Sequence, residues 1–319
     1  MCTAVIKYLP EYGWVGCKNR DRNYKPNIVI KQSFKGDVES LYLYDLNTKY
    51  SEGVNQYGVS ILNTATAVKN DESEAAVARH KANGQAKRSG SFKAPDGVKM
   101  RKALKFKTPK EAAEFLASER LVGNTFCFNE EHCYLLEGGR DKKQFDDSME
   151  KTKEDSEYEW PEMKYVFTIR EIPKTETIIR TNTGHFLPWL GYQKDSDDAK
   201  QMMSRKSSDA RYKYAVKHTK DSSTPWDMVE DLAKLADKDS QLNPLRVGDY
   251  HKKNVMKTTG QICLIPKKRE MIYVPTWCNI DLSNFGKLNS HKTETFLTVK
   301  PRNVLDESAV DYLGSLLLK

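Results

Sequence analysis

The second residue of the chain is a cysteine, and its position could give it two chemical functions. Removal of Met1 would leave the Cys2 thiol and a free α-amine on the same residue. An α-amine has an unperturbed pKa of about 7.7–8.0, so it can accept and return a proton near neutral pH. One residue could therefore supply both the nucleophile and the base of an acyl-transfer reaction. A cysteine at this position can also arise by chance, so other residues must support the interpretation.

A charged segment at residues 18–22 could act on that cysteine. The chain is expected to turn at Tyr12-Gly13 and to return beside the first strand, which would bring Asp21 near Cys2. A carboxylate there can orient the thiol and the ammonium, and a neighbouring arginine or lysine favours the thiolate, the form that attacks. Similar clusters also occur in salt-bridged surface turns, so the meaning of this one depends on the rest of the chain.

The elements that would position these residues begin with a β-rich N-terminal third. Short β-rich runs separated by turn signals predict strands at residues 3–8, 14–17, 28–30, 40–44 and 58–63. We expect the last two of these strands to pair, with residues 53–58 as the loop between them.

Helices are expected in the middle and late parts of the chain. Thr108 is a predicted N-cap, followed by Pro109 at the first helical position and Glu111 in the first turn. These signals predict a helix at residues 109–118. Further helices are expected at residues 199–218 and 225–235, and strands at 125–137, 165–170, 176–180, 261–266, 269–274 and 293–299. Strands, then helices, then strands again favour an α+β layered fold over a parallel array of β-α-β units.

Length and composition limit the class of protein. The 319 residues, 38% hydrophobic and 30% charged, can bury a full core, and we expect one domain over residues 1–319. No run is long and apolar enough for a membrane-spanning helix, and residues 1–30 lack the apolar stretch of a secretory signal. We therefore expect a cytoplasmic protein with no membrane partner.

Two charged segments are expected to be loops. Residues 79–107 hold ten Lys or Arg against one acid and run into a helix, while residues 141–162 are mostly acidic. The net charge of +8 motivates the alternative of a non-catalytic nucleic-acid-binding protein. Such proteins usually also need a groove-reading element or stacking aromatic residues, and the basic segment contains only Phe92 and Phe106. We therefore expect no nucleic-acid partner.

The cysteines do not form a recognisable metal or disulfide pattern. The chain has six, without C-x-x-C spacing and too sparse for a disulfide scaffold. We expect reduced thiols, no structural metal and no cofactor. Cys127 and Cys133 are assigned to a strand, and Cys263 and Cys278 to packing.

Several short motifs follow Cys2 in a fixed order. They are Asn19-x-Asp21, residues 53–59 leading to Leu62-Asn63, the Thr-Asn pair at 181–182, and Ser207-Ser208 followed by Arg211-Tyr212. As an ordered set, this resembles the choloylglycine hydrolase and penicillin V acylase type of N-terminal-nucleophile (Ntn) hydrolase. The acyl-CoA:6-aminopenicillanate acyltransferases and acid ceramidase share the outline.

The resemblance implies a role for each matching residue. Cys2 would be the nucleophile, Asp21 would bind and orient its thiol and amine, and Asn63 would donate its side-chain amide to the oxyanion. Asn182 would hydrogen-bond the α-amine or the substrate, and Arg211 would anchor the group electrostatically.

One position departs from the family pattern. These hydrolases usually carry an arginine where this sequence has Lys18, and an arginine occurs instead at position 20. Either Lys18 keeps the role with a point charge, or Arg20 takes it over with a planar guanidinium, and the two differ in geometry.

The resemblance also implies a fold and a reaction. The fold would be a four-layer αββα sandwich with two antiparallel sheets that bring the site residues together at one end. The Cys2 sulfur would attack the carbonyl of a small-molecule linear amide, and the amine would leave as a thioester forms. Water would then hydrolyse the thioester and regenerate Cys2. No cofactor is implied, and homo-oligomers are common among relatives. The mechanism requires that Met1 is removed.

Two alternatives use the same nucleophile. An acyltransferase would pass the thioester to an amine instead of water, and the sequence does not separate this from hydrolysis. Class II glutamine amidotransferases also begin with cysteine, but their usual Cys-Gly start is missing here.

Overall fold

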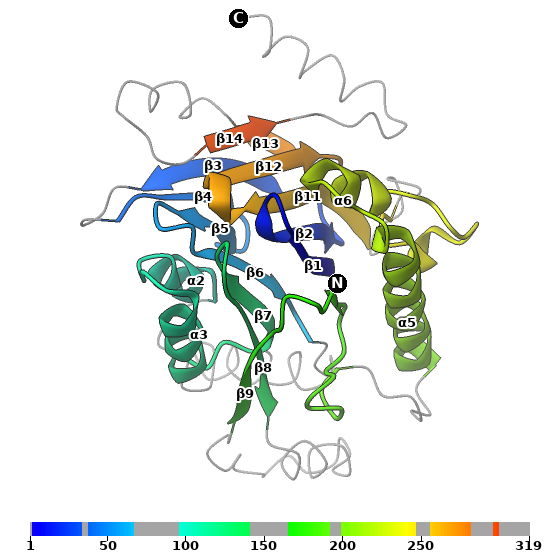
Figure 1. The fold of residues 1–319 in the computed structure, drawn as a ribbon. Helices are drawn as coiled ribbons and strands as arrows, with labels where there is room; N and C mark the ends of the chain where they lie inside the picture. Colours follow the sequence, from blue (N-terminus) through cyan, green and yellow to red (C-terminus); the bar gives the residue numbers. More distant parts are fainter. Residues whose placement is uncertain are drawn as a thin grey trace, which may run out of the picture.

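The computed structural model describes most of the chain and places it in two β-sheets and four α-helices (Figure 1). The described residues are 2–33, 38–66, 96–140, 165–191, 199–246, 256–281 and 296–299. The acidic segment at 141–162 and residues 79–95 of the basic segment lie outside them.

The smaller sheet has six strands and contains Cys2 in one of its inner strands. Its order is β10 (Ile178–Arg180), β1 (Cys2–Leu9), β2 (Gly13–Arg22), β11 (Lys257–Ile265), β12 (Glu270–Pro275) and β14 (Phe296–Val299). The predicted turn at Tyr12-Gly13 joins β1 and β2. Gly13 has φ 70°, and a Cβ there would lie 2.6 Å from the Glu130 carbonyl oxygen, so glycine suits both the turn and the close contact.

The larger sheet has eight strands and is built mostly from consecutive hairpins. Its order is β13 (Asn279–Asp281), β3 (Asn27–Ser33), β4 (Ser40–Asp45), β5 (Ser51–Asn55), β6 (Ser60–Thr64), β7 (Gly123–Phe128), β8 (Cys133–Arg140) and β9 (Tyr165–Glu171).

Both sheets are mixed, which corrects the expectation of two antiparallel sheets. β14 pairs parallel with β12 at one edge of the smaller sheet, and β13 pairs parallel with β3 at one edge of the larger sheet. Parallel pairing needs a connection longer than a hairpin. Between β12 and β14 the chain leaves the smaller sheet, adds β13 to the larger sheet and returns, which gives the longer connection.

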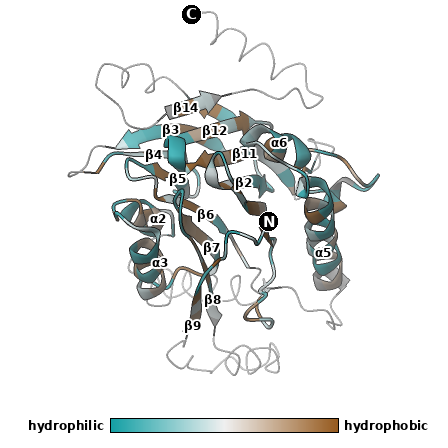
Figure 2. Ribbon diagram, in the orientation of Figure 1, coloured by the Kyte–Doolittle hydropathy of each residue, from teal (hydrophilic) through white to brown (hydrophobic). Residues whose placement is uncertain are grey.

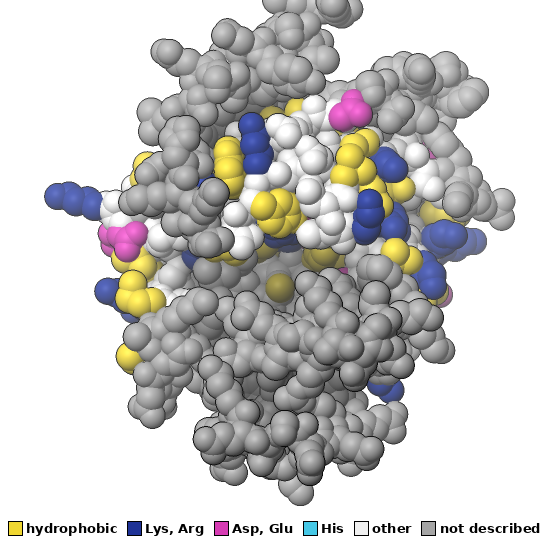
Figure 3. Space-filling model, turned by 180° about the vertical axis from the view of Figure 1, so that it is seen from behind, with side chains coloured by type: hydrophobic (Ala, Val, Ile, Leu, Met, Phe, Trp, Pro, Cys, Tyr) yellow, Lys and Arg dark blue, Asp and Glu magenta, His cyan; other side chains and the backbone are white. Residues whose placement is uncertain are grey.

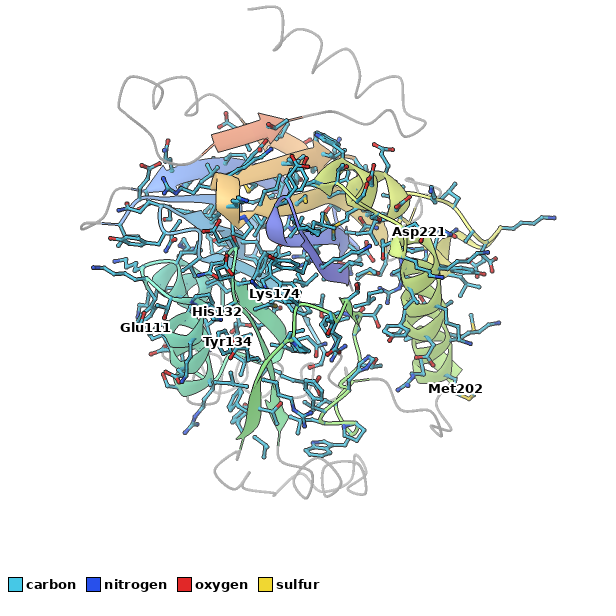
Figure 4. All side chains as sticks on the ribbon, in the orientation of Figure 1. Glu111, His132, Tyr134, Lys174, Met202 and Asp221 are labelled. Atoms are coloured by element: carbon cyan, nitrogen blue, oxygen red, sulfur yellow. The ribbon has the colours of Figure 1, made fainter. Side chains whose placement is uncertain are left out.

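The helices pack in pairs on different sheets. α2 (Asp96–Ala103) and α3 (Pro109–Ser118) contact the larger sheet, whereas α5 (Ala199–Thr219) and α6 (Pro225–Asp231) contact the smaller one (Figure 1). α3 has the predicted bounds and starts with a capping box, in which Thr108 accepts from the Glu111 backbone and Glu111 accepts in return. Glu111 is labelled on α3 in Figure 4. Short 3₁₀ turns occur at Ser240–Leu242 and Pro266–Lys268.

The described residues form three clusters of buried apolar side chains. The largest draws residues from both sheets, including Ile6 and Trp14 from the smaller sheet and Phe126 and Leu135 from the larger. The second lies between the smaller sheet and α5 and α6, and the third between the larger sheet and α2 and α3. Figure 2 shows hydrophobic residues along the central strands of both sheets. The α+β class is confirmed.

Three element predictions need correction. Residues 53–55 are not a loop, because β5 runs through them and separates β4 from β6. Residues 125–137 form two strands, β7 and β8, with a turn between them. The later part of the basic segment is helical, since α2 covers residues 96–103.

The described surface is mixed in character. On the face shown in Figure 3, the Lys and Arg side chains are spread among hydrophobic and uncharged ones. None of the helices in the described ranges is long and apolar enough to cross a membrane.

Candidate active site

Cys2 is buried at the start of β1, where polar side chains hold its backbone. Its backbone nitrogen donates to Asn182 Oδ1 at 3.2 Å, and its carbonyl oxygen accepts from Arg211 Nη1 at 2.8 Å. Only 4% of the residue is exposed. Residues distant in sequence therefore fix the backbone of the predicted nucleophile on both sides of its Cα.

Asn182 and Arg211 form one hydrogen-bonded unit. Arg211 Nη2 donates to Asn182 Oδ1 at 3.0 Å, and its Nη1 also donates to Thr3 Oγ1 at 3.0 Å. Asn182 Nδ2 donates to the Ala65 carbonyl oxygen at 2.6 Å. Ser208, on α5, binds the Asn182 backbone nitrogen at 3.3 Å. The structure thus brings two of the predicted site residues directly to Cys2.

Three cationic side chains of β2 lie on the same face of the smaller sheet as the Cys2 side chain. Cys2 is paired with Arg20 across the two strands, and alternation along β2 puts Lys18, Arg20 and Arg22 on that same face. Arg22 Nη1 lies 3.8 Å from the Cys2 sulfur. Of the two cations proposed from the sequence, neither makes this contact. Arg22, which the sequence reasoning did not select, is the cation bonded to the thiol.

Two buried carboxylates from the larger sheet oppose these cations. Glu52 on β5 pairs with Lys18 through Oε1 and with Arg20 through Oε2, the latter at 3.2 Å. Asp45 on β4 lies 3.9 Å from Arg20 Nη2 and 3.8 Å from Arg22 Nε. Both carboxylates are fully buried. We call these five residues the intersheet charge cluster.

The charge of the cluster favours an anion at Cys2. Three cations face two carboxylates, which leaves one formal positive charge in a buried region. Burial raises the pKa of the Cys2 thiol, but Lys18, the terminal ammonium of residue 1 and Arg22 outweigh burial and lower that pKa to about 7, with Asp21 acting against them. A thiolate at Cys2 would neutralise the excess charge.

The other thiols differ in this respect. Burial raises the pKa of Cys127, and burial together with nearby acidic groups raises the pKa of Cys133. Both lie in strands, as predicted. The neighbouring His132, labelled in Figure 4, pairs with Glu171 at 2.7 Å on the exposed surface. Cys2 is therefore expected to react with electrophiles at lower pH than these two cysteines.

The alkylation rate of Cys2 is expected to follow its thiolate fraction. The rate should rise about tenfold per pH unit below the midpoint and level off above a midpoint of about 7. Arg22→Met should raise the midpoint, because it removes a cation that stabilises the thiolate. Iodoacetamide labelling of Cys2, followed by peptide mass spectrometry across pH, measures both. Arg205→Met is the matched control, since Arg205 pairs with Asp209 on α5. Equal midpoints in all three proteins would contradict this expectation.

Asn63 lies near the end of β6, and both the oxygen and the nitrogen of its side-chain amide are hydrogen-bonded. Oδ1 accepts from the Tyr50 hydroxyl at 2.7 Å, and Nδ2 donates to Thr125 Oγ1 at 2.7 Å. The Asn63 carbonyl oxygen accepts from Lys18. Burial, with Glu52 and Cys2 nearby, raises the pKa of Tyr50, so its hydroxyl keeps the proton that it donates. Lys18 and Asn63 therefore belong to the same buried network.

Asp21 lies on the opposite face of β2 from the three cations. Its Oδ1 accepts from Thr258 Oγ1 at 2.8 Å, and its Oδ2 lies 3.5 Å from Arg246 Nε. Within the described residues, buried Oδ2 receives no hydrogen bond. Asp21 acts on the Cys2 pKa through its charge, and the contacts of its carboxylate are to β11 and the segment before it.

Glu137 fixes the segment that follows Asn182. This fully buried residue of β8 accepts from the backbone nitrogens of His185, at 2.9 and 3.0 Å, and Leu187, at 2.6 Å. Asn124, on the next strand, donates to the Thr183 carbonyl oxygen at 3.3 Å. The larger sheet therefore holds the loop from which Asn182 reaches the smaller sheet.

Comparisons with known proteins give matches among solved structures but none among sequences. No protein-family model and no curated protein sequence matches the chain. Among solved structures, the chain is similar to penicillin V acylase from Agrobacterium tumefaciens, with a TM-score of 0.40, 10% sequence identity, and 86% of each chain covered. A similarity of this size does not establish membership of a family.

Proposed function

We propose that the protein is an N-terminal-nucleophile amidohydrolase that cleaves a linear, non-peptide amide through a thioester on Cys2. The observation that carries the proposal is the environment of Cys2. Its backbone nitrogen is bound by Asn182 and its sulfur by Arg22, beside a cluster with excess positive charge. The proposed fold is the four-layer αββα sandwich, supported by apolar clusters between the sheets and beneath each helix pair.

The reaction begins after removal of Met1, which converts the Cys2 amide nitrogen into an α-amine. The Cys2 thiolate attacks the amide carbonyl, and the side-chain amide of Asn63 donates to the oxyanion. The α-ammonium, bound by Asn182 Oδ1, protonates the leaving amine as the thioester forms. The α-amine then takes a proton from water, which attacks the thioester and releases the acid.

Asp21 and Arg211 support this reaction without touching the reacting carbonyl. Asp21 Oδ2 lies 3.5 Å from Arg246 Nε, and Asp21 acts on Cys2 through its charge, so we assign it to electrostatic stabilisation of the new ammonium. Arg211 fixes the Cys2 carbonyl and the Asn182 acceptor together, at 2.8 and 3.0 Å. Arg211 would orient the α-amine through Asn182, and Asp21 would stabilise the charge of the ammonium.

Intact mass of the purified protein tests the proposal. We expect the mass to show loss of Met1, and one covalent adduct after brief treatment with an activated acyl ester such as p-nitrophenyl acetate. The adduct should be absent in Cys2→Ala. Retained Met1, or an adduct that persists in the variant, would overturn the proposal.

Hydrolysis and acyl transfer are separated by the fate of the acyl group. With p-nitrophenyl acetate and a primary amine such as glycinamide, a hydrolase should yield acetate at all amine concentrations. N-acetylglycinamide as the main product, in excess of the amount formed with Cys2→Ala, would instead assign the protein to acyl transfer.

A further inference from the structure

A pair of thiols lies on the outer side of the smaller sheet, on the opposite face from the intersheet charge cluster. Cys17 on β2 and Cys263 on β11 are directly opposed in antiparallel register. Their sulfur atoms are 2.6 Å apart, and each lies 4.0 Å from the Pro225 carbonyl oxygen at the start of α6. Both residues are buried.

We propose that Cys17 and Cys263 are a redox modification site, which forms a disulfide when the protein meets a small hydroperoxide. The inference is independent of the proposed function, since neither residue belongs to the Cys2 site. It rests on the register of the two strands and on the contact between the sulfur atoms.

The backbone already satisfies the geometric requirement for a disulfide. Directly opposed residues of antiparallel strands have Cα atoms about 4.5 or 5.5 Å apart. Disulfides span Cα distances of about 4.4–6.8 Å, so closing the bond needs no strand movement. Both side chains project from the same face toward α6, because paired residues of neighbouring strands share a face.

None of the other cysteines offers an equivalent pair. Cys127 is opposite Tyr134, and Cys133 is opposite Phe128, so these two lie on different faces of the larger sheet. Cys278 contacts the Tyr273 hydroxyl at 3.4 Å. All six cysteines are at described positions and are free thiols. Oxidation should therefore link one specific pair.

The chemistry balances with a hydroperoxide as the two-electron oxidant. One thiolate attacks the peroxide oxygen, which gives a sulfenic acid and releases water from hydrogen peroxide. The second thiol attacks the sulfenic sulfur, forms the S–S bond and releases a second water. One peroxide is reduced to two waters while two thiols become one disulfide.

Burial sets the rate of this step. Burial and the adjacent Cys263 raise the pKa of Cys17, so little thiolate is present at neutral pH. Disulfide formation should therefore quicken as the pH rises. It should also need a small oxidant, because the thiols lie beneath α6 and a bulky disulfide reagent cannot reach them without opening the fold.

The test is a thiol count after treatment with hydrogen peroxide. The experiment uses Cys2→Ala, so that oxidation of the reactive Cys2 does not contribute, and the protein is then denatured and alkylated without reductant. We expect two fewer alkylated cysteines than in the untreated variant, and a linked pair of peptides containing residues 17 and 263. The link should form faster at higher pH.

Two further variants keep the result interpretable. Cys127→Ala, which removes a buried thiol with no thiol opposite it, should still lose two alkylation sites. Cys263→Ala should form no link. An unchanged thiol count, oxidation to sulfinic acid, or links that involve other cysteines would overturn the proposal.

Discussion

Glu52→Ala is expected to lower the free energy of unfolding by about 3–5 kcal/mol, the usual cost of breaking a buried ion pair from one side. Glu52 is fully buried and pairs with both Lys18 and Arg20, and its Oε1 also accepts from the Asn63 backbone nitrogen at 3.2 Å. Removing the carboxylate would leave the three cations of the cluster with only one acid, Asp45. Urea unfolding followed by tryptophan fluorescence measures the loss.

A surface ion pair supplies the control for Glu52. Glu114→Ala removes the partner of Lys110, whose nitrogen is 4.0 Å away and which is mostly exposed on α3. Exposed pairs contribute about 0–1 kcal/mol, so this variant should unfold almost like the wild type. If Glu52→Ala lowers the free energy of unfolding by no more than about 1 kcal/mol, the charges of the intersheet charge cluster do not depend on one another as buried ion pairs would.

Asn63→Ala is expected to slow acylation of Cys2 by about 10²- to 10³-fold, the typical cost of removing one oxyanion donor. This expectation rests on the proposed function. Tyr50 and Thr125 hold the Asn63 amide in one orientation, so a donor there would be placed before the charge develops. The burst of p-nitrophenol released by p-nitrophenyl acetate measures the acylation rate.

Asn19→Ala is the matched control for Asn63. Asn19 is also a buried asparagine, but its amide binds Leu232 and Gln261 on the opposite face of β2 from the cations. Its burst rate should stay within a few-fold of the wild type under conditions where circular dichroism shows both variants folded. Equal losses in the two variants would attribute the Asn63 effect to general destabilisation and not to the oxyanion.

Local signals predicted the elements that are determined locally. The helix at Pro109–Ser118 begins where predicted because Thr108 and Glu111 satisfy backbone groups of its first turn. The β1–β2 hairpin follows from a turn at Gly13 and puts Cys2 opposite Arg20. Alternation within residues 18–22 would also have indicated Arg22, since it shares a face with the two cations that were selected.

Glu52, one of the two acids of the cluster, was missed because Gly53 was interpreted as a loop residue. Gly53 lies inside β5, where a Cβ would meet the Leu41 carbonyl oxygen at 2.1 Å, so glycine permits close strand contact there and does not mark a turn. Asn182 and Arg211 lie 180 and 209 residues from Cys2 in sequence. No local pattern relates positions so far apart, and only the resemblance of ordered motifs selected them.

The composition of the smaller sheet has a consequence for biosynthesis. The larger sheet takes seven of its eight strands from residues 27–171, whereas β1 and β2 are flanked by strands from residues 178–180 and 257–265. Because a nascent chain emerges from its N-terminus, β1 has only β2 as a native neighbour until much of the polypeptide has left the ribosome. During that interval, the contacts of Asn182 and Arg211 with Cys2 do not yet exist. If Met1 is removed as proposed, we expect the removal to fall within that interval, before these contacts bury Cys2.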